Sequence, residues 1–216
     1  HTNDSIFGDV HSPNLSASGI MRQGHASGAR SGRAERARGL DLRTPMTTPK
    51  ITIVGRSSSH YTRVVRIFAH ELGVAYAFAP VLDIMSLDAS VFAGNPALKV
   101  PVLVSEAGPL FGSENICREI VRLSGKASGV VSRGQVSDRL VANGEELVLH
   151  VMSAEVTFIM ASAAKSAPPP KLMRSIEASL RHLDDHLEEI LAALPDGRAL
   201  SFFEVALFCL VTHLPF

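Results

Sequence analysis

The sequence contains few cysteines and few aromatic residues: it has two cysteines, two tyrosines and no tryptophan. Cys117 and Cys209 are far apart and stand in apolar segments, so we expect buried thiols in a reducing compartment rather than a disulfide. The absence of a C-x-x-C pair argues against disulfide redox chemistry. No uninterrupted apolar run approaches the roughly 18 residues of a membrane span. We therefore expect a cytoplasmic protein that does not enter a membrane.

The chain also lacks a charge of one dominant sign. Lysine plus arginine and aspartate plus glutamate both number 21, which gives a formal net charge of zero. Such a balance predicts neither a nucleic-acid-binding surface nor a surface for anionic lipids. With 46% hydrophobic residues in 216, the chain can build the core of one or two domains.

Residues 1–48 are rich in Ser, Gly, Arg and His and show no periodic apolar pattern. This composition cannot bury enough surface to offset the entropy of ordering, so we interpret the stretch as a disordered or non-native leader. Six arginines between Arg22 and Arg43 leave a transit peptide as the alternative. Met46 resembles a natural start, and we expect the chain to be a fragment at both ends.

Residues 49–126 carry the signals of an α/β layer. Tyr61, Val65, Phe68 and Leu72 share one helical face, and Gly73 ends that helix. Ser113 is predicted to cap a later helix, which Gly125 ends. Strands are predicted at 50–54, 75–81, 101–105 and 109–111, with helices at 61–72, 86–92 and 113–124. The order βαβ-α-ββα predicts one sheet with a parallel unit followed by a hairpin.

The rest of the chain is predicted to be helical. Residues 127–134 are small and polar and are interpreted as a linker to a helical domain at 135–216. A long apolar segment at 136–165 ends before three prolines, and an amphipathic helix follows at 172–194. Ser201-Phe202-Phe203-Glu204 is a capping box that opens the last helix.

Pro101 stands at the start of the apolar strand Val102-Leu103-Val104. A proline cannot donate to a strand ladder and therefore belongs at a strand's first residue, an edge or a bulge. The Val100–Pro101 bond is either trans, as most X-Pro bonds are, or cis. A cis bond would turn the Val100 main chain outward, where it could pair with an extended ligand.

Several motifs in order resemble the cytosolic glutathione S-transferase superfamily, in its serine-type, bacterial-like form. The matching stretches are Ser57–Ile67, Glu71–Val74, Asn95–Leu103, Gly112–Ile116 and Leu200–Val205. The resemblance spans residues 50–216. It implies a thioredoxin-like N-terminal domain followed by an all-helical C-terminal domain that is short of the family's last helices.

The resemblance also implies a glutathione site. Val100–Pro101 would be cis, and the Val100 main chain would pair with the cysteinyl part of glutathione. Ser113 would bind the γ-glutamyl carboxylate at a helix N-terminus, which favours anions, and Lys99 would meet the glycyl carboxylate. Ser59 would be the catalytic residue, because its hydroxyl would face the sulfur and stabilise the thiolate.

Two residues depart from the family pattern. Gly112 stands where the family usually has Glu or Gln, although Glu114 is near enough to contribute to glutathione binding. His60 stands where the family often has proline. Ser57 and Ser58 remain rivals of Ser59 for the residue that faces the sulfur.

The resemblance implies a homodimeric detoxification enzyme that joins the glutathione thiolate to a small hydrophobic electrophile. Glutathione would be a co-substrate, with no tightly bound cofactor. The alternative is a non-catalytic binding or interaction protein of the same family. Disulfide reduction would need a cysteine at the position of Ser59.

No metal site is predicted from the sequence. His182 and His186 stand four residues apart with Asp185 between them, a spacing that could hold a metal. Leu183 and Leu187 mark the neighbouring buried stripe, so we interpret the two histidines as solvated.

Overall fold

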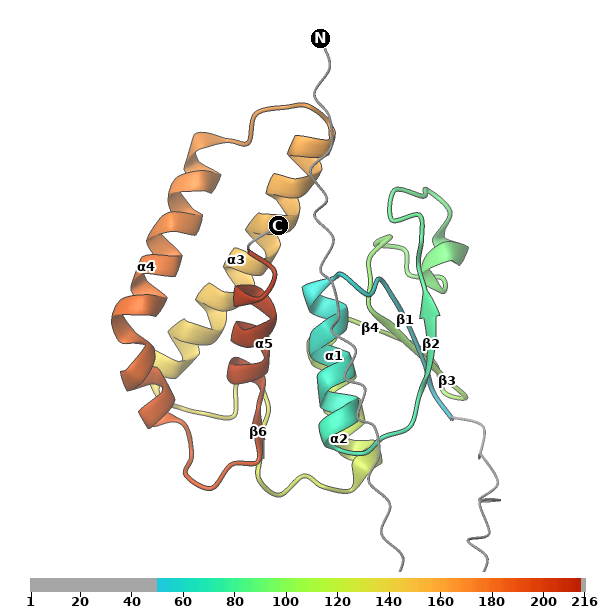
Figure 1. Cartoon of the computed structure of the whole chain (residues 1–216). Coiled ribbons are helices and arrows are strands. Elements are labelled where there is room, and N and C mark those ends of the chain that lie inside the picture. Colours follow the sequence, from blue (N-terminus) through green and yellow to red (C-terminus); the bar gives the residue numbers. More distant parts are fainter. Residues whose placement is uncertain (1–49, 215–216) are drawn as a thin grey trace, which may run out of the picture. The chain divides into compact units, whose positions relative to one another are not determined.

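The structure is a computed structural model that describes residues 50–214, all within a single unit. The leader predicted for residues 1–48 lies outside the described residues. Figure 1 shows a sheet with helices packed on one of its faces and further helices beyond them. The predicted fold class, a thioredoxin-like layer followed by a helical region, is confirmed.

The sheet has four strands in the order β2-β1-β3-β4. β1 (Thr52–Gly55) and β2 (Ala77–Pro80) are parallel and are joined by α1 (His60–Glu71). β3 (Val102–Ser105) runs antiparallel to β1, and β4 (Gly108–Phe111) runs antiparallel to β3. The short helix predicted between β2 and β3 is a 3₁₀ helix, η1 (Ala89–Phe92).

The register of the sheet aligns one row of residues across three strands. Val54 of β1 pairs with Val102 of β3, and Val102 pairs with Phe111 of β4. Because neighbouring strands alternate in direction, this row combines the end of β1, the start of β3 and the end of β4. The segments that follow β1, precede β3 and follow β4 therefore leave the sheet at the same edge.

α1 and α2 (Ser113–Ser124) lie between the sheet and the other helices (Figure 1). Their apolar stripes join the core through residues such as Phe68 and Ile120. One expectation is wrong: the N-cap of α2 is Gly112, not Ser113, and no side chain among the described residues caps this helix. Gly112 has φ +85°, a conformation that glycine adopts without steric cost.

The helical region contains α3 (Arg139–Ala163), α4 (Pro170–Ala193) and α5 (Phe202–Val211). The segment 127–134, predicted to be a linker, includes a strand that the sequence pattern does not predict. It contains β5 (Val130–Val131), a buried strand that pairs in parallel with β6 (Leu200–Ser201) just before α5. This small sheet anchors the connection to the base of α5.

One core runs through both regions. The rings of Phe68 in α1 and Phe202 in α5 have centroids 6.3 Å apart. Gly144 of α3 lets α4 and α5 approach closely, because an added Cβ would lie 3.0 Å from Ile190 and 3.1 Å from Phe203. The last helix therefore packs directly against the thioredoxin-like layer.

By length and composition alone, α3 is the one helix among the described residues that could cross a membrane. Its sequence contains Glu145 and Glu155, which interrupt the apolar character, and both carboxylates are buried in this fold. The buried face of α3 also supplies Val148, Val151 and Met152 to the common core. A single such helix is weak evidence of a membrane span, because core helices pass the same test.

One of the two hydrogen bonds of the predicted capping box of α5 is present. The Ser201 Oγ accepts a hydrogen bond from the Glu204 N–H at 3.1 Å. The Glu204 carboxylate does not reach back to the main chain; instead it accepts from the Ser201 hydroxyl at 2.6 Å and from both Arg198 Nε and Nη2. The cap is therefore part of a charged cluster that the sequence pattern does not show.

Ser201→Ala should lower the free energy of unfolding by about 1–2 kcal/mol, because a buried N-cap would be lost from the helix that joins the two regions. Urea denaturation measures the change. Ser137→Ala is the matched control: Ser137 is exposed and precedes Asp138, the N-cap of α3. The control should stay within about 0.5 kcal/mol. Equal stabilities of the Ser201 variant and the unmodified protein would contradict the assigned cap.

Candidate site at one edge of the sheet

Ser59 connects the end of β1 to α1 and is the N-cap of that helix. Its Oγ accepts a hydrogen bond from the Thr62 N–H at 3.3 Å, which leaves the hydroxyl proton available for another acceptor. Ser57 and Ser58 are exposed in the preceding turn, whereas Ser59 is half-buried. Ser59 therefore acts as a cap and retains the ability to donate to a ligand.

The Val100–Pro101 peptide bond is cis, the geometry that the family resemblance implies. Pro101 is buried, Val100 is half-buried and Lys99 is exposed. Val100 precedes β3, and among the turn and loop hydrogen bonds of residues 50–214 none involves its main chain. Its peptide groups therefore suit an extended ligand.

The buried side chain of Asn95 holds the segment before the cis bond. Its Nδ2 donates to the Lys99 carbonyl at 2.8 Å, and its Oδ1 accepts from the Ala97 N–H at 3.0 Å. Asn95 is not among the site residues predicted from the sequence. The signal was available, because an Asn-Pro pair favours turns in which the Asn side chain bonds to nearby main chain.

Ser113 is the first residue of α2 and is buried. The early N–H groups of a helix have no intrahelical partners and carry the positive end of the helix dipole, so they favour an anion. Because Gly112 contributes no side chain to the cap, the start of α2 is open to an external acceptor. This local structure fits the carboxylate-binding role that the sequence analysis assigns to Ser113.

The strand register brings the three segments together. Ser59 follows β1, Val100 precedes β3 and Ser113 follows β4, all beyond the row Val54–Val102–Phe111. Neighbouring strands lie about 4.8 Å apart, so the row spans roughly 10 Å from β1 to β4. That span suits a short extended peptide with a thiol at one end of the row and a carboxylate at the other.

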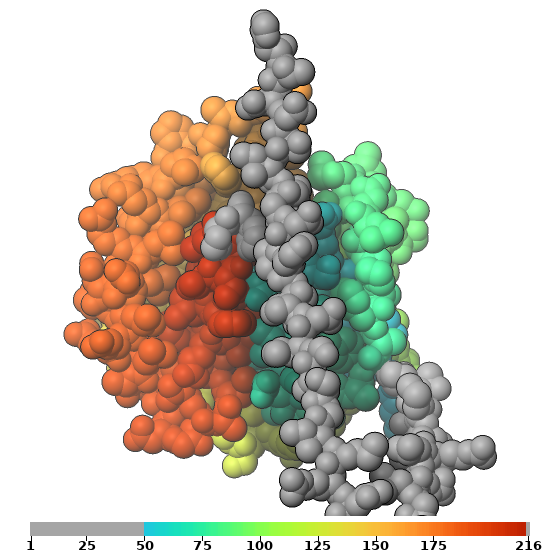
Figure 2. Space-filling model, in the orientation of Figure 1, coloured from blue at the N-terminus to red at the C-terminus, as the bar shows by residue number. Residues whose placement is uncertain are grey.

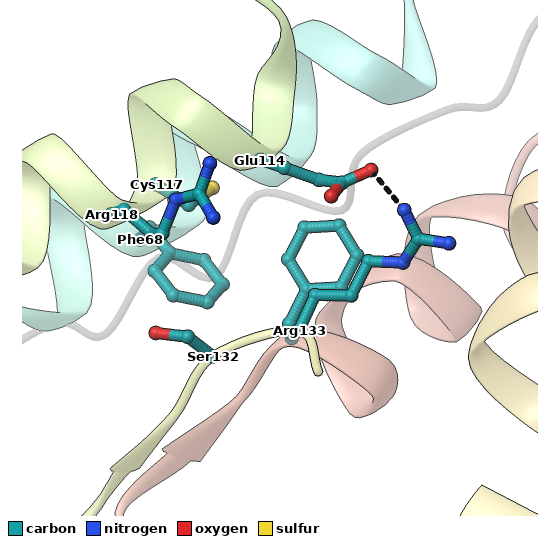
Figure 3. A pocket seen from close by; sticks show the side chains of 7 residues that line it. Phe68, Glu114, Cys117, Arg118, Ser132 and Arg133 are labelled. Atoms are coloured by element: carbon teal, nitrogen blue, oxygen red, sulfur yellow. Dashed lines mark hydrogen bonds and ion pairs between the residues drawn. The ribbon is translucent and has the colours of Figure 1, made fainter. Parts of the chain in front are cut away.

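Glu114, a predicted contact of glutathione, forms an ion pair with an arginine. Its Oε1 accepts from Arg133 Nη1 at 2.7 Å (Figure 3). Arg133 Nη2 also donates to Glu146 at 2.7 Å. Arg133 comes from the segment that the sequence analysis interprets as a linker. Glu114 must therefore exchange or share this partner before its carboxylate can contact a ligand.

Two cavities lie elsewhere. A pocket of about 10 Å³, room for about one water, is lined by residues that include Glu114, Arg133 and Phe202 (Figure 3). An open groove of about 700 Å³ lies between α4 and α5, whose side chains are adjacent on the face shown in Figure 2. Neither lining includes Ser59, Val100 or Ser113.

His60, the first residue of α1, points into the protein and meets the helical region. Its Nδ1 lies 3.4 Å from Glu155 Oε2, and Glu155 Oε1 accepts from His213 Nδ1 at 2.7 Å. Burial, the neighbouring His213 and Arg63 lower the pKa of His60 to about 4, although the Met152 carbonyl acts in the opposite direction. The His60 ring is therefore neutral at pH 7. No sequence pattern predicts that these residues meet, because they lie far apart in the chain.

Tyr61 is the remaining hydroxyl near the start of α1. Burial raises its pKa to about 12, against the effect of a hydrogen bond with Ser153. Its half-buried ring packs against the core, as the sequence analysis predicts. Tyr61 is therefore less suited than Ser59 to stabilise a thiolate at the sheet edge.

The fold and this edge define a class: a protein with a thioredoxin-like N-terminal layer, a cis-proline at one edge of its sheet and a helical region behind it. Residues 54–128 match the family described as "Glutathione S-transferase, N-terminal domain". The chain is 26% identical over 166 residues to an uncharacterized GST-like protein of Escherichia coli, YibF, covering 76% of this chain and 82% of that protein.

Solved structures share the fold. A glutathione S-transferase from Methylobacillus flagellatus with glutathione bound has a TM-score of 0.60 at 22% identity, covering 76% of this chain and 83% of that one. A glutathione transferase homologue from Drosophila mojavensis with bound glutathione has a TM-score of 0.60 at 18% identity, covering 77% and 78%. Residues 54–128 are thus similar to the N-terminal domain of glutathione S-transferases, and the chain shares the fold of the solved glutathione S-transferases.

Beside this edge, Glu145 provides a test of the charge network. Burial raises the pKa of Glu145, against a hydrogen bond from the Gly134 N–H and the positive charge of Arg133. The native state thus holds the proton more tightly than the unfolded state, so ionising Glu145 destabilises the fold as pH rises above the carboxyl's ordinary value of 4.5.

Glu145→Gln keeps an acceptor for Gly134 and removes this ionisation. The variant should therefore gain stability relative to the unmodified protein as pH rises through and above 4.5, and the difference should vanish below it. Denaturant unfolding on both sides of that pH measures the gain. Glu188→Gln, an exposed change on α4, should show no such trend. A loss of stability at neutral pH in Glu145→Gln would contradict the assigned cost of burial.

Proposed function

We propose that the protein is a glutathione transferase that joins the thiolate of glutathione to a small hydrophobic electrophile. The observation that carries the proposal is the arrangement of Ser59, Val100 and Ser113 at one sheet edge, imposed by the strand register. Two structural neighbours contain bound glutathione, which supports the same ligand class here. Glutathione is a co-substrate in this proposal, and no tightly bound cofactor takes part.

Each part of the tripeptide has a partner in this arrangement. The γ-glutamyl carboxylate accepts hydrogen bonds from the start of α2 and from the Ser113 hydroxyl. The cysteinyl main chain pairs with the Val100 peptide, which Pro101 presents at the mouth of β3. The exposed Lys99 ammonium meets the glycyl carboxylate. These contacts orient the thiol toward α1.

Ser59 is the proposed catalytic residue. Its hydroxyl proton donates to the sulfur, and the positive end of the α1 dipole further favours the thiolate over the thiol. The thiolate then attacks the electrophile: a sulfur–carbon bond forms, and the leaving group departs with its electron pair. Because a thiolate is the stronger nucleophile, lowering the thiol pKa accelerates this step at neutral pH.

A binding protein without transferase activity is the second candidate. Two observations favour it: Gly112 offers no side chain to the glutathione amine, and Glu114 is engaged by Arg133 at 2.7 Å. The two candidates share glutathione binding and differ in whether the bound thiol ionises and reacts. We propose a cytoplasmic homodimer with a detoxification role for the catalytic candidate.

The folded chain should be retained on immobilised glutathione, and calorimetry should show binding. Ser113→Ala should weaken the affinity about tenfold or more, because a hydrogen bond to a charged group contributes roughly 1.5–3 kcal/mol. Ser128→Ala, an exposed change beyond α2, is the matched control and should bind normally. Absence of both retention and calorimetric binding would refute the glutathione site.

Ser59→Ala should raise the apparent pKa of the bound thiol by about one unit, the equivalent of one hydrogen bond to a charged acceptor. At neutral pH, the variant should lose the ultraviolet absorbance of the bound thiolate and should conjugate more slowly. Its affinity for glutathione should remain largely unchanged. Ser57→Ala and Ser58→Ala serve as controls in the same turn. If one of them moves the thiol pKa and Ser59→Ala does not, the role belongs to that neighbour. If the unmodified protein shows no bound thiolate, the non-catalytic candidate is favoured.

A further inference from the structure

Three metal-ligating side chains meet where the thioredoxin-like layer contacts the helical region. His60 begins α1, Glu155 lies in α3, and His213 follows α5. One nitrogen or oxygen atom from each residue lies within 4.8 Å of the other two. Figure 1 shows α5 between α1 and α3, which explains how residues from three helices converge.

Glu155 is the centre of this cluster. Its Oε1 accepts from His213 Nδ1 at 2.7 Å, and its Oε2 lies 3.4 Å from His60 Nδ1. The two imidazole rings meet edge to face, with centroids 4.7 Å apart. The carboxylate thus presents one oxygen to each ring.

The cluster contains buried polar atoms whose hydrogen-bonding capacity is unused. Among the described residues, Glu155 Oε2 and the two ring nitrogens of His60 have no partner in good hydrogen-bond geometry, although the Met152 carbonyl lies near enough to the ring to raise its pKa. The His60 side chain is only 1% exposed. Buried polar side chains are nearly always satisfied, so these atoms favour a further partner bound beside them that the described residues do not supply.

We propose that His60, Glu155 and His213 bind a divalent transition-metal ion, with Zn²⁺ as the best match. Two imidazoles and one carboxylate are the donor set of catalytic zinc sites, and three protein ligands leave one position for water or a ligand. Imidazole donors favour zinc, cobalt, nickel or copper over magnesium and calcium, which prefer oxygen.

The three ligand atoms lie within 4.8 Å of one another, and Glu155 faces each ring with a different oxygen, so the ligands must draw closer together to accept one ion. With metal–ligand distances of about 2.0–2.1 Å, adjacent ligand atoms in a tetrahedral site lie about 3.3 Å apart. The two Glu155 contacts, at 3.4 and 2.7 Å, lie on either side of that value. On binding, the ion takes the place of the proton that His213 Nδ1 shares with Glu155. The side chains of Glu155 and His213 are 11% and 16% exposed, which provides an entry path that His60 lacks.

This metal site is distinct from the proposed glutathione site, because His60, Glu155 and His213 are not among the residues proposed to bind glutathione. His60 is also a departure from the family pattern, which often has proline at this position. The test must be made without glutathione, since a free thiol would itself bind the metal. Failure of the metal site would leave the glutathione proposal intact, and the reverse also holds.

The experiment titrates the chelator-treated full chain with Zn²⁺ by calorimetry and with Co²⁺ by visible absorption, which reports coordination number. Glu155→Gln and His213→Ala should each weaken the tightest binding event by more than the roughly 10–100-fold typical of losing an outer-shell partner. His213 is the safer variant because it is the least buried ligand. The control is the double change His182→Ala and His186→Ala on α4, whose rings lie 4.5 Å apart and form a rival surface pair.

The proposal is supported if the control binds normally and the two ligand variants do not. It is overturned if the unmodified chain does not bind either metal, or if the ligand variants bind as tightly as the unmodified chain. If the variants do not fold, X-ray absorption of the unmodified zinc-loaded chain decides. A first shell with two imidazoles and one carboxylate supports the site, and any other protein ligand set overturns it.

Discussion

The antiparallel pairing of β3 with its two neighbours is the constraint on which the candidate ligand edge depends. Val102 pairs with Val54 on one side and with Phe111 on the other. A register shift of one residue would turn the side chains of β3 to the opposite face and displace the cis-proline from the row. The sheet thus sets both the packing of α1 and α2 and the alignment of Ser59, Val100 and Ser113.

Two helices begin at this edge, and their N-termini are used differently. The first turn of α1 is capped by Ser59, so part of its capacity for hydrogen bonding is satisfied within the protein. The first turn of α2 follows Gly112 and has no side-chain cap. An anion therefore gains more at α2, where unpaired N–H groups would otherwise bond only to water. This difference is consistent with carboxylate binding at α2 and thiolate stabilisation at α1.

Much of the fold could be predicted because its signals act over short distances. Helix periodicity, the glycine after α1, the proline before β3 and the Ser201 capping box each involve residues within one or two turns. The errors arose where a local signal was ambiguous. Ser113 resembles an N-cap in sequence, but Gly112 takes that position because its positive φ ends the preceding strand. Val130 and Val131 looked like part of a linker, and pairing with β6 made them a strand.

The sequence by itself determined the element order, the fold class and three of the residues at the candidate edge, because a family motif records them in a fixed order. Only the tertiary structure decided that Arg133 holds Glu114, and that His60 meets Glu155 and His213. These contacts join residues that lie far apart in the sequence. The first contact depends on where the segment after β5 meets α2, and the second on how α1, α3 and the end of α5 pack. No local sequence pattern encodes these distances.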